Sequence, residues 1–275
     1  MQSSELINSS SIIVKIVIGI SAIVVGLIVI RLLTSVISSF FDDSGSPVLI
    51  DGMVDAKHLV IYPQDPAETN SMTIYRSVDE NKGIEFTWST WIFIDNLQYR
   101  KNVYRNIFYK GNRDLQSNGL NNVIHAPGLY IAPNTNALVV FMNTFEVIDN
   151  EILIPNIPLN KWLNIIIRCR NTTLDIYVNG TITRSVELMG IPRQNYGDVH
   201  VASGGGFDGF ISNLRYFNRA IGVMEIDKIV EAGPNTDLIG TSEVENTGNS
   251  SFLSLRWFFG SNFTPPPSIK RIHSI

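Results

Sequence analysis

The sequence predicts an all-β fold, a two-sheet antiparallel sandwich preceded by one transmembrane helix. Three observations lead to this prediction: an apolar segment near the N-terminus, short runs of β-branched and aromatic residues separated by Asn, Gly, Asp and Pro, and an Asn179-Gly180 pair. Such spacing is typical of antiparallel sandwiches, and Asn-Gly between apolar runs is a strong hairpin signal. With 275 residues the chain has room for one large domain and an appendage.

The apolar segment covers residues 12–33 and reads IIVKIVIGISAIVVGLIVIRLL. Its length is near the roughly 20 residues that a helix needs to cross hydrocarbon, and the flanking Lys15 and Arg31 can reach the headgroups. A buried core helix would keep a polar stripe, and a cleaved signal peptide would have a more basic start. We therefore expect a membrane span, marked by Ile12, Lys15, Ile16, Ile30, Arg31 and Leu33, whose orientation the small charge bias does not decide.

Composition changes divide the chain into further segments. A short polar N-terminus, 1–11, precedes the span, and a polar Gly/Ser/Pro linker, 34–48, follows it. The sandwich is expected over 49–260, and a Pro-rich basic tail over 261–275. The tail favours an extended arm or simple terminal disorder.

The clearest strand is FTWSTWIFI, residues 86–94. Both of its alternating faces are apolar, which favours a central strand buried on both sides. Residues 129–142 and 174–188 predict two hairpins, the second around Asn179-Gly180. The single cysteine, Cys169, alternates with apolar neighbours in LNIIIRCR and is expected to be a buried, inert thiol; the lack of disulfides favours a reducing compartment.

These segments resemble, in order, laminin-G-like domains of the concanavalin A-like jelly-roll type. The resemblance covers about Ile84 to Pro234 and is carried by the following stretches: FTWSTWIFI with IFYKGN, GLYIAPNTNALVVF, IPLNKWLNIIIRCRNTTLDIYVNG and GGGFDGFISNLRYFNRAIGVMEIDKIV. It implies a jelly-roll fold and leaves the function open. The sequence around IPNIP and GGF is also similar to membrane-anchored proteins of large DNA viruses.

The stretch EIDKIVE, Glu225 to Glu231, is similar to the Glu-x-Asp-x-x-Glu run of retaining laminarinases and lichenases, in which two carboxylates act on the sugar. On one strand the carboxylates would share a face. On a helix they would not: Asp227 and Glu231 would form a solvated pair beside an apolar stripe. Because laminin-G-like domains usually continue from the preceding NRAI into a short helix, we expect a helix and assign no catalytic residue.

Charge and residue spacing bear on ligand classes. Net charge is −4 and no basic face stands out, which argues against a nucleic-acid partner. Loop oxygens for calcium occur at Asp95, Asn96, Asn134, Asn136 and Asp208, but Asp and Asn in turns usually serve the backbone, so no metal site and no cofactor are assigned. The candidate ligand-binding residues at a sandwich rim are Tyr99, Asn134, Asn136 and Asp208.

We therefore expect a non-enzymatic recognition or structural module, anchored in a membrane, with the lipid bilayer and protein neighbours or glycans as partners. A virion membrane or minor capsid component is the setting that the viral resemblance implies. Two alternatives stay open. A lectin would use exposed aromatic and planar polar groups such as Tyr99, Tyr104, Asn134 and Tyr196, and a laminarinase-type hydrolase would hold Glu225 and Glu231 in a cleft, about 5 to 5.5 Å apart.

Overall fold

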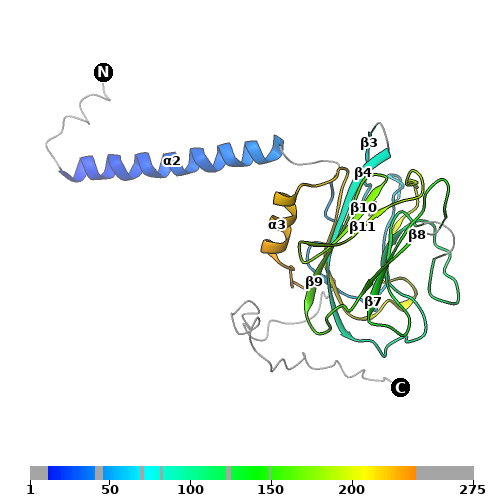
Figure 1. The fold of residues 1–275 in the computed structure, drawn as a ribbon. Helices are drawn as coiled ribbons and strands as arrows, with labels where there is room; N and C mark the ends of the chain where they lie inside the picture. Colours follow the sequence, from blue (N-terminus) through cyan, green and yellow to red (C-terminus); the bar gives the residue numbers. More distant parts are fainter. Residues whose placement is uncertain are drawn as a thin grey trace. The chain divides into compact units, whose positions relative to one another are not determined.

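The computed structural model describes residues 12–40, 46–68, 71–80, 83–121, 125–148 and 150–239. A helix, α2 (Ile12–Phe40), comes first, then a β-sandwich, and then a second helix, α3 (Val223–Ala232) (Figure 1). The predicted N-terminus, 1–11, the tail, 261–275, and the last part of the predicted sandwich range, 240–260, lie outside the described residues.

The prediction of a two-sheet antiparallel sandwich is confirmed. One sheet has seven strands, in the order β1 (Met53–Asp55), β13 (Asp208–Phe217), β4 (Gly83–Asn96), β9 (Trp162–Asn171), β10 (Thr173–Val178) and β11 (Thr181–Glu187), with β3 (Val78–Glu80) also paired to β4. The other has six strands, in the order β2 (Val60–Tyr62), β12 (Val199–Val201), β5 (Arg105–Lys110), β6 (Gly128–Ile131), β7 (Ala137–Met142) and β8 (Asn150–Pro155). Both predicted hairpins are present, as β6–β7 and β10–β11, and Asn179 and Gly180 have the positive φ angles that the tight turn requires.

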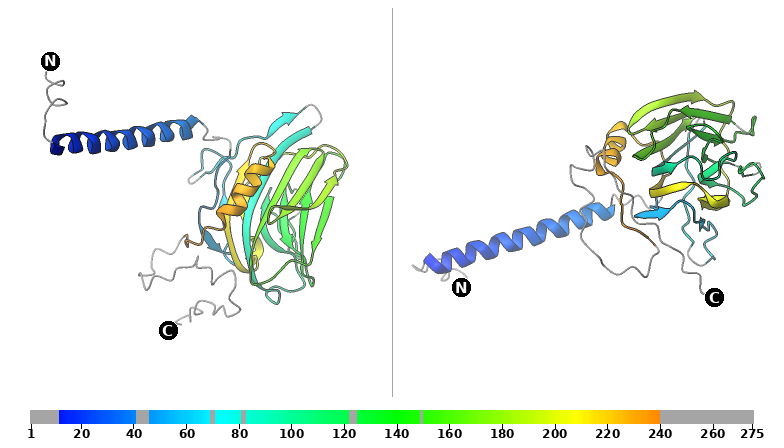
Figure 2. Two further views of the ribbon diagram at one scale, coloured as in Figure 1. Left: turned by 60° about the vertical axis from the view of Figure 1, so that its left-hand side comes forward. Right: turned by 90° about the horizontal axis from the view of Figure 1, so that it is seen from below.

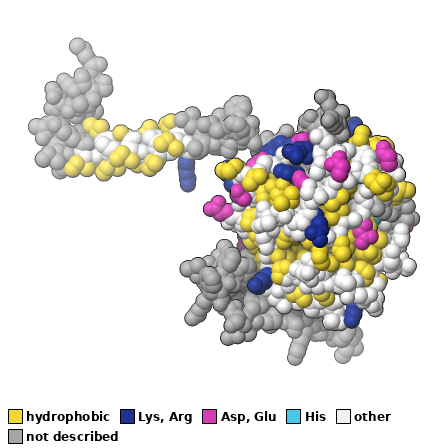
Figure 3. Space-filling view, in the orientation of Figure 1, with side chains coloured by type: hydrophobic (Ala, Val, Ile, Leu, Met, Phe, Trp, Pro, Cys, Tyr) yellow, Lys and Arg dark blue, Asp and Glu magenta, His cyan; other side chains and the backbone are white. Residues whose placement is uncertain are grey.

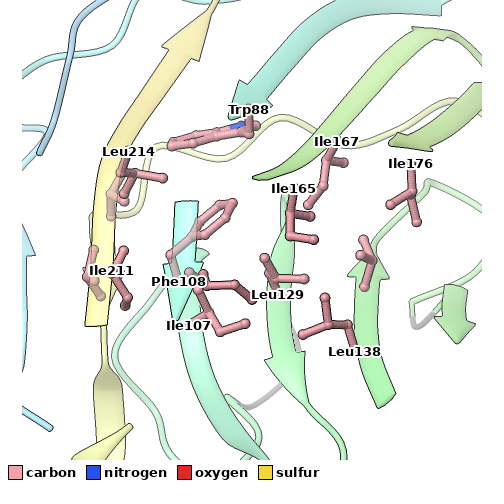
Figure 4. Packing of buried hydrophobic residues seen from close by; sticks show 14 of the residues in the cluster. Trp88, Ile107, Phe108, Leu129, Leu138, Ile165, Ile167, Ile176, Ile211 and Leu214 are labelled. Atoms are coloured by element: carbon pink, nitrogen blue, oxygen red, sulfur yellow. The ribbon is translucent and has the colours of Figure 1, made fainter. Parts of the chain in front are cut away.

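The hydrophobic core lies between the two sheets. Figure 4 shows side chains of both sheets pointing toward one another, with Trp88 beside Phe108 and Leu214. β4 lies between β9 and β13 and is buried on both faces, as its two apolar faces predicted. Cys169 is fully buried in this core, and burial raises the pKa of its thiol to about 12, so the prediction of a buried, inert thiol is confirmed.

Helix α3 covers the outer face of the seven-stranded sheet (Figures 1 and 2). Ile226 of α3 is fully buried and packs with Ile166, Tyr177 and Phe217 from β9, β10 and β13. Asp227 and Glu231 are exposed on the opposite side of the helix. The expected helix after NRAI, with its apolar stripe and solvated carboxylates, is therefore confirmed.

Helix α2 continues past Leu33, where the span was predicted to end, to Phe40. Residues 34–40 contain no Gly or Pro, so no helix breaker interrupts the backbone there. Its described side chains, residues 16–31, are almost all exposed, and hydrophobic groups lie along it (Figure 3). Within the described part of the chain, no helix is long and apolar enough to cross a membrane. The predicted span 12–33 extends beyond the described side chains and stays a prediction.

Because every strand pair is antiparallel, the connections gather at two ends of the sandwich. We call one end the rim end; its connections include 56–59, 97–104, 132–136, 156–161 and 202–207. We call the other the cavity end; its connections are 63–77, 143–149 and 188–198. The chain enters the sandwich at the cavity end, where Val48 bridges to Arg215 and the Tyr216 amide donates to the Pro47 carbonyl over 3.2 Å.

Candidate functional site

The structure brings two of the predicted ligand-binding residues together at the rim end. Asp208 opens β13, where it forms an ion pair with Lys57 and accepts a hydrogen bond from the Asn96 side chain. The Lys57 ammonium lies 5.2 Å from the centre of the Tyr99 ring. The hydrogen bond to Asp208 raises the pKa of Lys57, so Lys57 is charged at neutral pH. Asp208 and Tyr99 are thus already occupied by Lys57.

The other two predicted residues belong to the β6–β7 turn at the same end. Asn134 has a φ of 60° and is exposed, as turn chemistry favours for Asn. The Asn136 side chain donates to the Ile157 carbonyl, and its own carbonyl accepts from the Asn156 amide over 2.9 Å. Asn136 therefore ties the turn to the β8–β9 connection. Whether any of the four binds a ligand stays a prediction.

Arg105 organises the rim end from beneath, although the sequence did not single it out. Its side chain is only 1% exposed and donates to the Leu97 carbonyl over 2.9 Å and to the Ala132 carbonyl over 2.6 Å. Desolvation lowers the pKa of this guanidinium. The residue joins the β4–β5 connection to the β6–β7 turn, so the rim end is held together by internal polar contacts.

Within the described ranges, no three His, Cys, Asp or Glu side chains lie close enough together to hold a metal ion. Asp95 and Asp208 are near one another, since burial first and Asp208 second raise the pKa of Asp95. The cation between these carboxylates is Lys57, which lowers the Asp95 pKa in turn. Calcium therefore stays unassigned.

A cavity of about 430 Å³ opens at the cavity end. Its lining comes from strands of both sheets and from the connections 63–77 and 188–198. Its inner wall contains Trp88 and Tyr216, whose ring centroids are 5.0 Å apart, and Trp88 is backed by Phe108 in the core, with the centroids 5.1 Å apart. Phe86 and Met142 complete this apolar wall. These side chains point inward because they belong to the core faces of their strands.

Lys110 is the buried cation of the cavity. It ends β5, is 8% exposed, and its ammonium donates to the carbonyls of Asn195 and Gly197 over 2.8 and 2.7 Å. Burial lowers the pKa of Lys110 to about 8. The loop can approach this closely because a Cβ at Gly197 would lie 2.4 Å from the backbone of Gly111. Lys110 thus fixes the 188–198 connection over the cavity.

Two polar atoms in the cavity lining lack partners. Among the described residues, the Gln194 side-chain nitrogen and the Ser77 hydroxyl are buried without a hydrogen bond. An unpaired buried donor is costly, so a ligand group that pairs with it gains free energy. Tyr75 and Tyr196, which are 58% and 88% exposed, belong to the same lining and present apolar ring faces. The cavity combines ring surfaces, unpaired polar groups and a cation.

The similarity of EIDKIVE to a glucanase motif does not extend to its geometry. Glu225 lies in the first turn of α3, where both of its oxygens accept from the Arg219 guanidinium over 2.8 Å and one also accepts from the Gly222 amide. Arg219 is the largest cause of the lowered pKa of Glu225. The carboxylate caps a helix, and Asp227 and Glu231 are exposed, so this stretch does not form the cleft that the hydrolase alternative requires.

Sequence reasoning placed the candidate site at the rim end, whereas the cavity described above lies at the cavity end. Of the aromatic residues considered for sugar stacking, only Tyr196 belongs to the cavity lining. A signal was present in IPRQNYG, where basic, amide and aromatic residues follow one another in a connection. Lys110, which directly follows the run Ile107 to Tyr109 at the end of β5, was a second signal. Neither shows which loops meet until the strand order is known.

The family comparison agrees with the fold. Residues 66–227 match the model of the laminin-G type described as the concanavalin A-like lectin/glucanases superfamily, which covers more than half of the chain. No curated protein matches the chain.

Several solved structures are similar. The receptor binding domain of botulinum neurotoxin D is 11% identical with a TM-score of 0.46, and the match covers 69% of this chain and 53% of that one. The binding domain of Paraclostridial Mosquitocidal Protein 1 is 14% identical with a TM-score of 0.45, covering 69% and 46%. The botulinum neurotoxin serotype G binding domain is 13% identical with a TM-score of 0.45, covering 70% and 51%. The chain spans about half the length of each of these domains.

Proposed function

The chain belongs to the concanavalin A-like lectin/glucanases superfamily, and we propose that it is a non-enzymatic binding module whose cavity takes a saccharide unit. A pyranose ring has an apolar face that stacks on aromatic rings and hydroxyls that pair with planar polar groups. Tyr75 and Tyr196 supply the rings, and Gln194 and Ser77 supply unpaired polar groups. The unpaired Gln194 nitrogen in this setting is the observation that carries the proposal.

The ligand class follows from the chemistry of the lining. Lys110 is charged below a pH of about 8, and although its ammonium already donates to Asn195 and Gly197, its positive charge favours an acidic or strongly electronegative group in the cavity. Arg193, also in the lining, is an exposed second cation. An acidic saccharide fits these groups better than an apolar ligand, because the latter would leave Gln194 and Ser77 unpaired.

A panel of immobilised neutral and acidic oligosaccharides tests this proposal, with the full chain in detergent as the probe. Tyr196→Ala is expected to weaken retention on the acidic sugars about tenfold or more, because it removes a stacking surface. Tyr99→Ala, at the rim end, is the matched control and should retain binding. A larger loss of retention in Tyr99→Ala than in Tyr196→Ala contradicts the proposal. So does a lack of retention of the unsubstituted chain on any sugar.

The absence of catalysis is part of the proposal. It is supported by the engagement of Glu225 with Arg219 and by the exposed positions of Asp227 and Glu231. A reducing-sugar assay on β-glucans with the purified chain should show no release above background. Activity that Glu225→Gln abolishes would favour the hydrolase alternative.

We also propose that α2 anchors the module in a membrane, and that this membrane belongs to a virion. The first step is supported by the apolar sequence of 12–33 and the exposure of the described α2 side chains, and the second by the sequence resemblance to membrane-anchored viral proteins. Alkaline carbonate extraction of expressing cells tests the anchor: the full chain should remain in the membrane pellet. Release into the supernatant would exclude it.

A further inference from the structure

Four large apolar side chains are exposed together at the cavity end. We call them the apolar tip: Phe145, Ile148, Met189 and Ile191, which are 69%, 53%, 68% and 42% exposed. The first two belong to the 143–149 connection and the last two to the 188–198 connection. Clustered exposed apolar groups are unusual on a soluble surface and mark sites of interaction.

Hydrogen bonds hold the two connections of the apolar tip against each other. The Phe145 amide donates to the Ile191 carbonyl over 3.1 Å, and the Thr144 hydroxyl donates to the Met189 carbonyl over 2.7 Å. The Arg193 amide also donates to the Asn143 carbonyl over 2.9 Å. The tip is therefore a prebuilt surface, and its exposure does not come from a single loose loop.

Charges beside the apolar tip are balanced. The Arg193 guanidinium lies 5.4 Å from the centre of the Phe145 ring. The Glu146 carboxylate packs against Gly190, where a Cβ would overlap it. With one cation and one anion at its edge, the tip offers apolar surface without a strong preference for an anionic partner.

Chain connectivity limits how far this end can lie from a membrane that holds α2. The described sandwich begins at Ser46, at the cavity end, and α2 ends at Phe40. The helical residues 34–40 and the connection 41–45 together span at most about 30 Å. If 12–33 crosses the bilayer, the cavity end is therefore the end of the sandwich that is tethered beside the lipid surface.

We propose that the apolar tip docks on the lipid bilayer that α2 spans, inserting Phe145 and Met189 at the level of the headgroups. This inference rests on the proposed membrane anchor. Lipid is the occupant favoured by three independent features: exposed apolar side chains from two linked connections, balanced edge charge, and attachment of the anchor at the same end. Docking holds the cavity beside the membrane surface, so the ligand it meets is presented on the same membrane.

A site-specific fluorescent label tests the docking in the full chain. Cys169 is fully buried and its thiol pKa is raised to about 12, so an introduced cysteine reacts selectively at neutral pH. An environment-sensitive label is placed on Ile148→Cys in one sample and on Asn134→Cys, at the rim end, in another. Each is reconstituted into phosphatidylcholine vesicles that contain phosphatidylcholine with brominated chains. The label at 148 should be quenched and the label at 134 should not, with little change between low and high salt.

Substitution of the apolar tip sharpens the test. Phe145→Asp with Met189→Asp should reduce the docked-to-undocked ratio by about tenfold or more, seen as lost quenching at 148. Ile182→Asp replaces an exposed isoleucine near the rim end and is the matched control. All three positions are exposed, so thermal unfolding should be little changed.

Flotation of the same vesicles separates the two proposals. A chain that floats and resists carbonate but shows equal quenching at 148 and 134 overturns docking and leaves the anchor. A chain that does not float overturns both. A label at 148 that is shielded from water but not quenched by brominated lipid indicates a second copy of the chain on the apolar tip, and also overturns docking.

Discussion

Both ends of the sandwich carry polar and aromatic side chains, but these side chains differ in the hydrogen bonds and ion pairs that they form. At the rim end Asp208, Lys57 and Asn136 pair with one another or with the backbone, and Arg105 donates to two carbonyls while its Nε has no partner. At the cavity end the Gln194 nitrogen and the Ser77 hydroxyl have no partner among the described residues, and the apolar tip is exposed. The difference teaches that loop polarity alone does not locate a binding site, and that an unpaired polar group indicates one where it lines a cavity, as Gln194 and Ser77 do.

The first prediction concerns Arg105, whose loss should have the largest effect. Arg105→Met removes the donors to the partly buried Leu97 carbonyl and the buried Ala132 carbonyl. Each orphaned group costs about 1 to 3 kcal/mol, and the relief of a buried charge offsets part of it, so we expect a loss of about 3 kcal/mol in the free energy of unfolding. Urea denaturation measures it.

Arg100→Met is the control, because Arg100 is an exposed arginine on the same connection. It should change the free energy of unfolding by less than about 0.5 kcal/mol. Equal effects of the two substitutions would mean that the rim end is not organised by Arg105, and the contrast between the two ends would weaken.

The second prediction uses the pKa of Lys110 at the cavity end. Burial lowers it to about 8, whereas an unfolded lysine titrates near 10.4. Between these pH values the unfolded chain binds more protons, so stability rises with pH, by an amount on the order of 3 kcal/mol. The increase in stability with pH ends above about pH 10, where tyrosines of the unfolded chain lose their protons. Burial raises the pKa of Tyr62 to about 12, so in the folded chain this tyrosine keeps its proton there, and stability then falls with pH.

Urea denaturation from neutral pH to about pH 10 measures this slope. Lys110→Met should flatten it, whatever its effect on absolute stability. Lys161→Met, an exposed lysine at the rim end, should leave the slope unchanged. A slope that persists in Lys110→Met would show that another group is its source.

The third prediction separates binding from stability at Gln194. Gln194→Leu removes a nitrogen that has no partner in the described structure, so the free energy of unfolding should stay within about 0.5 kcal/mol of the unsubstituted value. Saccharide binding should weaken about tenfold, the value of one hydrogen bond. Retention on the oligosaccharide panel measures binding, and urea denaturation measures the free energy of unfolding. A loss of stability without a loss of binding would contradict the proposal.

Much of the fold could be predicted because its signals are local. The alternation in FTWSTWIFI and the Asn179-Gly180 turn depend on neighbours in sequence, and β4 and the β10–β11 hairpin follow them. The helix at EIDKIVE was predicted from its position after NRAI, and the packing of Ile226 explains why that pattern forms a helix.

The candidate site could not be predicted in the same way. Trp88, Lys110 and Gln194 come from three distant segments that meet only through the order of strands in the two sheets. Tyr99, Asn134, Asn136 and Asp208 were selected as polar or aromatic loop residues, yet residue type does not reveal that Lys57 and the Ile157 carbonyl already occupy three of them. Long-range partners decide which polar groups remain available.

The last prediction has the smallest effect and compares the ends most directly. Asp208→Asn removes the charge that pairs with Lys57 but keeps an oxygen that can accept from Asn96. Because both side chains are partly exposed, the loss should be only about 0.5 to 1 kcal/mol and should shrink at high salt. Saccharide retention should be unchanged, since Asp208 lies at the other end from the cavity. If Asp208→Asn weakens retention more than Gln194→Leu does, the rim end is the binding site after all, because a substitution that only disturbs a local ion pair has no route to the cavity.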